Sequence, residues 1–181
     1  MLGRGNSALE NELYHPCNNV LHSAFRLKLR LLRARLTEVH LVVGVAVLVL
    51  NLAVGLWGVT AAAFNRTPVA FWYVLRAAQV SVVLQVLLGA LLLVAGHEPK
   101  DAIHYMYGTA PLVVNLFAEG MRTGAAQREL PDDVQFEGLP AAEQHTIALR
   151  IVRREMMIMS LAALLVFAFA LRAAQVSGAL F

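Results

Sequence analysis

The chain has 181 residues, of which 59% are hydrophobic and only 15% are charged, and its formal net charge is +3. A soluble domain carries roughly 25% charged residues, so this composition excludes an ordinary soluble globular protein. The small positive charge lies mostly near the N-terminus, which suits an anionic membrane surface better than a nucleic acid. We therefore expect the lipid bilayer to be a partner and expect no nucleic-acid partner.

Residues 1–38 are expected to form a tail and a basic amphipathic helix. Residues 1–23 are polar and are expected to be irregular. In residues 24–36 one helical face is apolar and five basic side chains lie around it (Phe25, Leu29, Leu32, Leu36; Arg26, Lys28, Arg30, Arg33, Arg35). Such a helix can lie in the lipid headgroup region. The basic residues can equally serve only to orient the first span, and the sequence leaves both interpretations open.

Residues 39–181 contain four apolar segments, at about 39–64, 71–96, 102–121 and 156–177. A helix needs roughly 20 apolar residues to cross the hydrocarbon, and only helices or closed barrels satisfy the backbone there. The apolar runs are continuous and do not alternate, which favours helices over barrel strands. Short first and second connections favour antiparallel neighbours, so the expected fold is an all-α, integral membrane, up-down-up-down four-helix bundle.

The third segment is the least hydrophobic, and a polar loop at 122–155 separates it from the fourth. Within that loop Pro140 can open a helix at its first turn, and this helix would continue into the fourth span.

The distribution of basic residues gives an expected orientation. The basic cluster before the first span favours cytoplasmic N- and C-termini in a bacterial cytoplasmic membrane. Arg150, Arg153 and Arg154 would then lie on the outer side, against the positive-inside rule.

The first and third spans share the pattern H-x3-G-x6-N, at His40-Gly44-Asn51 and at His104-Gly108-Asn115. Positions i, i+4 and i+11 fall on one stripe of a helix. Small and polar residues on such a stripe indicate helix contacts or an internal cavity. We therefore predict a two-hairpin internal repeat, with both histidines facing the bundle interior at the same depth.

Two interpretations of this stripe remain open. In one, the polar side chains bond across helices and the glycines permit close packing, with no cofactor. In the other, His40 and His104 are the axial ligands of the iron of one b-type haem, held between facing helices. Gly44 and Gly108 would leave room for the porphyrin, and Arg172 is a candidate partner for a propionate.

The interior of the bundle should hold further polar pairs. Gln85 lies near mid-membrane and must find a partner. Arg76 and Glu119 lie at the end opposite the histidines, where they can form an ion pair. Snorkelling of Arg76 to the headgroups is the other interpretation.

The runs LRAAQVSVVLQVLLGALLL, HYMYG and NLFAEGMR are similar to those of bacterial four-span membrane proteins to which no activity is attached. The likeness covers about residues 38–178 and implies the number of spans. The histidine layout resembles, more loosely, the diagonal haem ligation of cytochrome b-type bundles. Those bundles usually hold two haems, whereas this sequence offers one histidine pair.

The sequence contains no P-loop, GxSxG or HExxH motif and no paired carboxylates within a span, so we expect no catalytic activity of its own. The function it favours is a small accessory subunit of a larger membrane electron-transport complex, with other membrane subunits as partners and one haem b between the first and third spans. The alternatives are a cofactor-free structural or assembly subunit, and a small transporter or lipid-binding protein.

Overall fold

The computed structural model describes residues 6–97, 101–129 and 136–178, and these residues are almost entirely helical. The elements are four long helices and one short 3-10 turn (α1, Asn6–Ala63; α2, Val69–Val94; α3, Ile103–Glu129; η1, Phe136–Gly138; α4, Ala141–Val176). The predicted all-α class is confirmed for this part of the chain.

Three of the helices are long and apolar enough to cross a membrane, and their apolar windows lie within Phe25–Ala63, α2 and α4. This confirms the prediction of a membrane protein with transmembrane helices. The fourth expected span, α3, has 27 residues, or roughly 40 Å at ~1.5 Å per residue. Its length is therefore sufficient, but polar residues such as His104, Asn115 and Glu119 lower its hydropathy.

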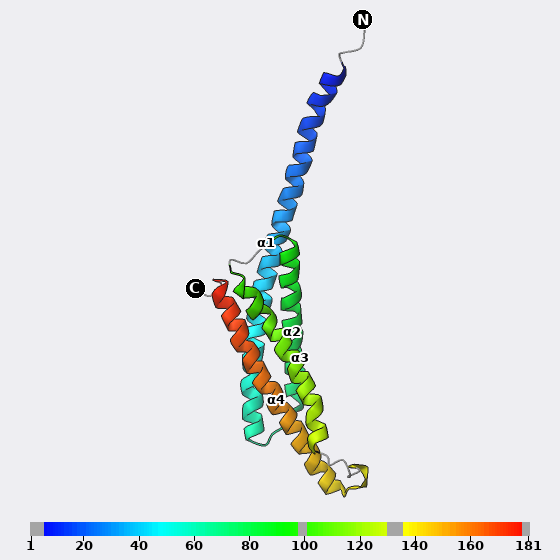
Figure 1. Cartoon of the computed structure of the whole chain (residues 1–181), viewed down its shortest axis with the longest axis vertical. Helices are drawn as coiled ribbons and strands as arrows, with labels where there is room; N and C mark the ends of the chain where they lie inside the picture. The colour runs from blue at the N-terminus through cyan, green and yellow to red at the C-terminus, as the bar shows by residue number, and fades with distance from the viewer. Residues whose placement is uncertain (1–5, 98–100, 130–135, 179–181) are drawn as a thin grey trace.

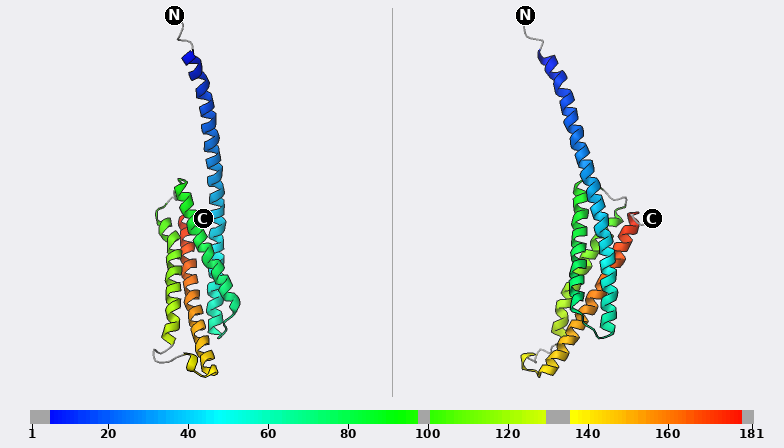
Figure 2. Two further views of the ribbon diagram at one scale, coloured as in Figure 1. Left: turned by 90° about the vertical axis from the view of Figure 1, so that its right-hand side faces the viewer. Right: turned by 180° about the vertical axis from the view of Figure 1, so that it is seen from behind.

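The helices pack side by side, and each runs back along the one before it (Figures 1 and 2). α1 packs against α2 and α4, and α3 packs mainly against α4. The contact between α2 and α3 is slight. The N-terminus and the C-terminus therefore lie toward the same end of the molecule, and the 64–68 turn lies at the other.

The N-terminal region differs from expectation. α1 is one continuous helix of 58 residues, which corresponds to roughly 87 Å. Residues 6–23 are helical where irregular structure was expected, and no break separates a 24–36 helix from the first span. From Asn6 to Val43 the sequence has no glycine and only one proline, so little opposes helix propagation. The N-terminal half of α1 projects beyond the other helices (Figure 1).

The connection between α3 and α4 is shorter than the 122–155 loop that was expected. α3 continues to Glu129, and α4 begins at Ala141 directly after Pro140. The predicted helix start at Pro140 is confirmed. Alanine, glutamate, glutamine and arginine dominate the flanking sequences, and these residues favour helix even where they are too polar for lipid.

Glycines on α1 allow the tightest helix packing in the core. A methyl group placed at Gly58 would overlap Ser160 of α4 and would come within 2.5 Å of Phe71 of α2. One placed at Gly55 would lie 2.7 Å from the Leu164 side chain. Small residues let helix backbones approach closely, which is a main source of packing energy in membranes. Gly58 therefore sets the distance between α1 and α4.

This packing predicts that Gly58→Ala lowers stability by roughly 1–3 kcal/mol, because the added methyl group overpacks the helix contact. Gly108→Ala is the matched control, since no described atom lies within 4 Å of where its methyl group would be. Alanine also favours helix over glycine, so the control should unfold at the same temperature or higher. Thermal unfolding in detergent, followed by circular dichroism, measures both. Equal unfolding temperatures for the two variants would contradict the assigned packing.

Candidate functional site

His40 lies on α1 at the end of the bundle where α1 projects, called here the histidine end. The half-buried ring places its Nε2 atom 3.1 Å from Nε2 of Gln85 on α2. With the amide N–H donating, the imidazole nitrogen accepts and the ring proton resides on Nδ1. Within the described residues, His40 Nδ1 and Gln85 Oε1 are buried and have no hydrogen-bond partner. Buried polar atoms of this kind indicate a missing donor or acceptor, such as water or a ligand.

The glycines around His40 accommodate side chains. A Cβ atom at Gly44 would lie 3.1 Å from Nε2 of Gln85, so the space beside Gly44 is occupied by that amide. A Cβ atom at Gly89 would lie 3.4 Å from Cε1 of His40, which is an ordinary van der Waals contact, so Gly89 lies against the imidazole. Gln85 and Gly89 are four residues apart on α2, and this spacing places both on the face that meets His40.

His104 lies at the start of α3, at the same end of the bundle. Its Nδ1 atom donates to the carbonyl oxygen of Ala173 on α4 at 3.1 Å. The proton then resides on Nδ1 and the lone pair on Nε2, the arrangement that metal-binding histidines commonly adopt. The sequence could not predict this partner, because every residue has a backbone carbonyl and no residue type marks the one that accepts.

Gly108 lies four residues after His104 on α3. Arg172 lies on α4, next to the Ala173 whose carbonyl accepts from His104. No atom of the described residues approaches within 4 Å of a Cβ position at Gly108, so that side of α3 is open. Arg172 is adjacent to Ala173, is exposed, and donates to Oε1 of Gln175 at 3.4 Å. It is therefore at the histidine end, where a propionate partner was expected.

The two imidazoles turn to different neighbours. His40 contacts α2 and His104 contacts α4. A haem between them would use the available Nε2 of His104 but would have to displace Gln85 from His40. By hydrogen bonding alone, Nε2 of His104 could bind iron without losing a partner, whereas Nε2 of His40 could do so only after leaving Gln85. Among the described residues, no three His, Cys, Asp or Glu side chains form a metal-binding group.

The asparagines of the repeat also differ in their surroundings. Asn51 is buried and donates to the carbonyl oxygen of Val47 in its own helix at 2.8 Å. Asn115 is also buried, but its Nδ2 atom has no hydrogen-bond partner in the part of the chain that the structure describes. The two asparagines at equivalent positions of the sequence repeat therefore differ in their hydrogen bonding.

At the opposite end, called here the arginine end, Glu119 of α3 joins α2 to α3. Arg76 and Gln79 of α2 donate to its Oε1 atom at 2.5 and 2.8 Å. Arg122 donates to its Oε2 atom at 3.0 Å and also lies 3.8 Å from Oε2 of Glu155 on α4. Of the two interpretations of Arg76, the structure shows the ion pair. This network links α2, α3 and α4 where α2 and α3 otherwise touch little.

No protein-family model matches the chain, and no curated protein or solved structure matches it either. The resemblance to four-span bacterial membrane proteins therefore stays a prediction.

The network predicts that Glu119→Ala destabilises the bundle by about 1–3 kcal/mol, because two arginines and an amide lose their shared acceptor. Glu38→Ala is the control: it removes a carboxylate whose pair with Arg35 has side chains 81% and 68% exposed. Exposed pairs contribute at most about 1 kcal/mol, so the control should change little. Thermal unfolding in the same detergent compares them. A Glu119→Ala variant as stable as the control would show that the network does not hold the helices together.

Proposed function

We propose that the chain is a four-span integral membrane protein that acts as a small subunit of a larger electron-transport complex in the bacterial cytoplasmic membrane. Four observations support this proposal: the separate polar and apolar faces of α3, the projecting part of α1, the location of both termini at one end of the bundle, and the histidine pair.

The arrangement of α3 supports its role as the fourth span. The polar side chains His104 and Glu119 bond to α4 and α2, so they are satisfied inside the bundle. The outward side chains Leu116 and Phe117 are 66% and 71% exposed. With His104 and Glu119 paired inside and apolar side chains outside, α3 is suited to lipid, where each unpaired polar group is costly. Among the described residues Asn115 Nδ2 is the exception on this helix.

The projecting part of α1 supports a role within a larger assembly. Phe25 and Leu32 are 61% and 56% exposed, and they belong to the apolar stripe seen in the sequence. A straight helix of this length extends well beyond a hydrocarbon core of ~30 Å. Its apolar stripe can be covered by another subunit at the membrane surface.

The common location of the termini supports their proposed orientation. The N-terminal arm and the C-terminal end of α4 lie toward the histidine end (Figure 1). Basic residues of α1 from Arg26 to Arg35 flank the first span at this end. By the positive-inside rule this cluster favours cytoplasmic termini, whereas Arg150, Arg153 and Arg154 at the other end count against that orientation.

The histidine pair supports electron transport as the class of function. One b-type haem, bound by His104 and by a His40 released from Gln85, would supply one-electron chemistry. In this chain the Ala173 carbonyl orients His104, and the adjacent Arg172 would be the candidate partner of a propionate.

A cofactor-free structural subunit is the second candidate, and the contact between Gln85 and His40 favours it. In that case the amide and the imidazole stabilise the contact between α1 and α2, and Gly44 leaves room for the amide.

The proposal predicts a Soret band, and an α-band on reduction, in the absorption spectrum of protein purified from haem-replete cells. His40→Ala and His104→Ala should each abolish both bands. His145→Ala is the matched control, because His145 is exposed on α4 near the other end. Gln85→Leu separates the two candidates: it should preserve the bands if His40 is a ligand. A protein without these bands, destabilised by Gln85→Leu, would instead be the cofactor-free subunit.

A further inference from the structure

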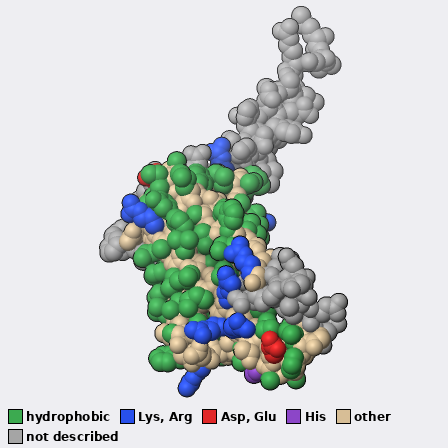
Figure 3. Space-filling model, turned by 60° about the horizontal axis from the view of Figure 1, so that its bottom comes forward, with side chains coloured by type: hydrophobic (Ala, Val, Ile, Leu, Met, Phe, Trp, Pro, Cys, Tyr) green, Lys and Arg blue, Asp and Glu red, His purple; other side chains and the backbone are tan. Residues whose placement is uncertain are grey.

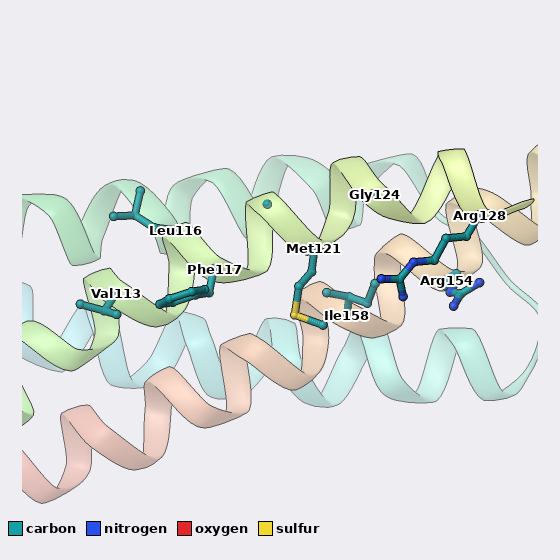
Figure 4. A pocket seen from close by; sticks show the side chains of 9 residues that line it. Val113, Leu116, Phe117, Met121, Gly124, Arg128, Arg154 and Ile158 are labelled. Atoms are coloured by element: carbon teal, nitrogen blue, oxygen red, sulfur yellow. The ribbon is translucent and has the colours of Figure 1, made fainter.

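A groove runs along the outer side of the contact between α3 and α4, with a volume of about 750 Å³. Its walls are apolar for most of their length and end at two arginines (Val113, Leu116, Phe117, Met121, Ile158; Arg128, Arg154). Figure 4 shows the arginine side chains together at one end and Val113 and Phe117 toward the other. The groove therefore has one long apolar part and one cationic mouth.

Two glycines of α3 make this hollow. Gly120 and Gly124 line the groove, and no described atom lies within 4 Å of a Cβ position at either residue. Unlike Gly58, they are not needed for contact between helices of the bundle. A larger side chain at either position would project into the groove and leave the packing unchanged.

The position of the arginines along the helices matches a membrane boundary. Arg154 precedes the apolar part of α4 by two residues, and Ile158 lies one turn further in. Arg128 lies in the last turn of α3. Figure 3 shows Lys and Arg side chains around this end beside the hydrophobic sides of the bundle. In a bilayer that α3 and α4 both cross, the mouth of the groove would lie level with the headgroups and its apolar part level with the acyl chains.

We infer that this groove binds an anionic phospholipid, with one acyl chain along α3 and α4 and the phosphate between Arg128 and Arg154. Basic pockets between transmembrane helices are suited to anionic headgroups. The volume lies within the roughly 300–1,000 Å³ of typical ligand sites. Arg154 also interacts within the chain, and a guanidinium has five N–H donors, so it can hold a phosphate in addition.

Charge favours a lipid over a second copy of the chain in this groove. Small residues four apart, as at Gly120 and Gly124, can mediate helix pairing. Two copies that share one membrane orientation would be related by a twofold axis along the membrane normal. Such an axis through the groove would bring Arg128 and Arg154 of both copies together, and these like charges would repel. A phosphate at the same place neutralises them.

Native mass spectrometry of the detergent-purified chain tests this inference. The probes are phosphatidylglycerol and phosphatidylcholine with identical acyl chains. We expect tighter binding of the anionic lipid, by about fivefold for each arginine that contacts the phosphate. Arg128→Gln combined with Arg154→Gln should remove this preference. Gly120→Leu should weaken the binding of both lipids, because it fills the apolar part of the groove.

Arg153→Gln is the matched control, since Arg153 is exposed on the same helix and does not line the groove. It should retain the preference. If the double variant does not fold, Arg128→Gln alone should reduce the preference about fivefold. Equal affinity of the native chain for both lipids would overturn the inference, as would a preference that survives loss of both arginines. A stable dimer that Gly120→Leu dissociates would assign the groove to a second copy and would also overturn it.

Discussion

Pairing between polar side chains and groups of neighbouring helices holds this bundle together, and most of these pairs involve α3. In hydrocarbon a charged or hydrogen-bonding group must find its partner within the protein. At one end of α3, His104 bonds to a backbone carbonyl of α4. Toward the other end, Glu119 accepts from Arg76, Gln79 and Arg122. These contacts turn this polar face of α3 toward α2 and α4, and leave Leu116 and Phe117 on its exposed face.

The packing of the helices depends on whether the space beside each glycine is filled by a neighbouring side chain or left open. Side chains of α4 and α2 fill the space beside Gly55 and Gly58, so α1 packs closely against both helices. The side chains of Gln85 and His40 lie against Gly44 and Gly89. Gly108, Gly120 and Gly124 on α3 face open space in the described part of the molecule. The tightly packed helices form the scaffold, and α3 leaves one side open.

The helical class and the membrane-length helices could be predicted from apolar runs alone, because these runs have few structural alternatives in lipid. The Arg76–Glu119 pair was one of two sequence-based interpretations, and only the packing of α2 against α3 decides between them. The repeat of His40 and His104 identified two residues at one end of the bundle. It could not show that Gln85 reaches His40 or that Ala173 reaches His104, because a repeat constrains positions along a helix and not the neighbours of each helix. The continuous α1 was not predicted, because the polar composition of its first residues was interpreted as irregular structure, although residues 6–23 contain no helix-breaking glycine.

The membrane crossing of α3 is the claim on which the other conclusions rest, and cysteine accessibility tests it most directly. The chain has one cysteine, Cys17, which reports the side of the N-terminal arm. In a Cys17→Ser background, Asp101→Cys and Gly138→Cys mark the two ends of α3. A membrane-impermeant maleimide applied to intact cells and to inverted vesicles should label position 101 from the same side as native Cys17 and position 138 from the opposite side. Labelling of positions 101 and 138 from one side would contradict the account, because α3 would then not span the membrane.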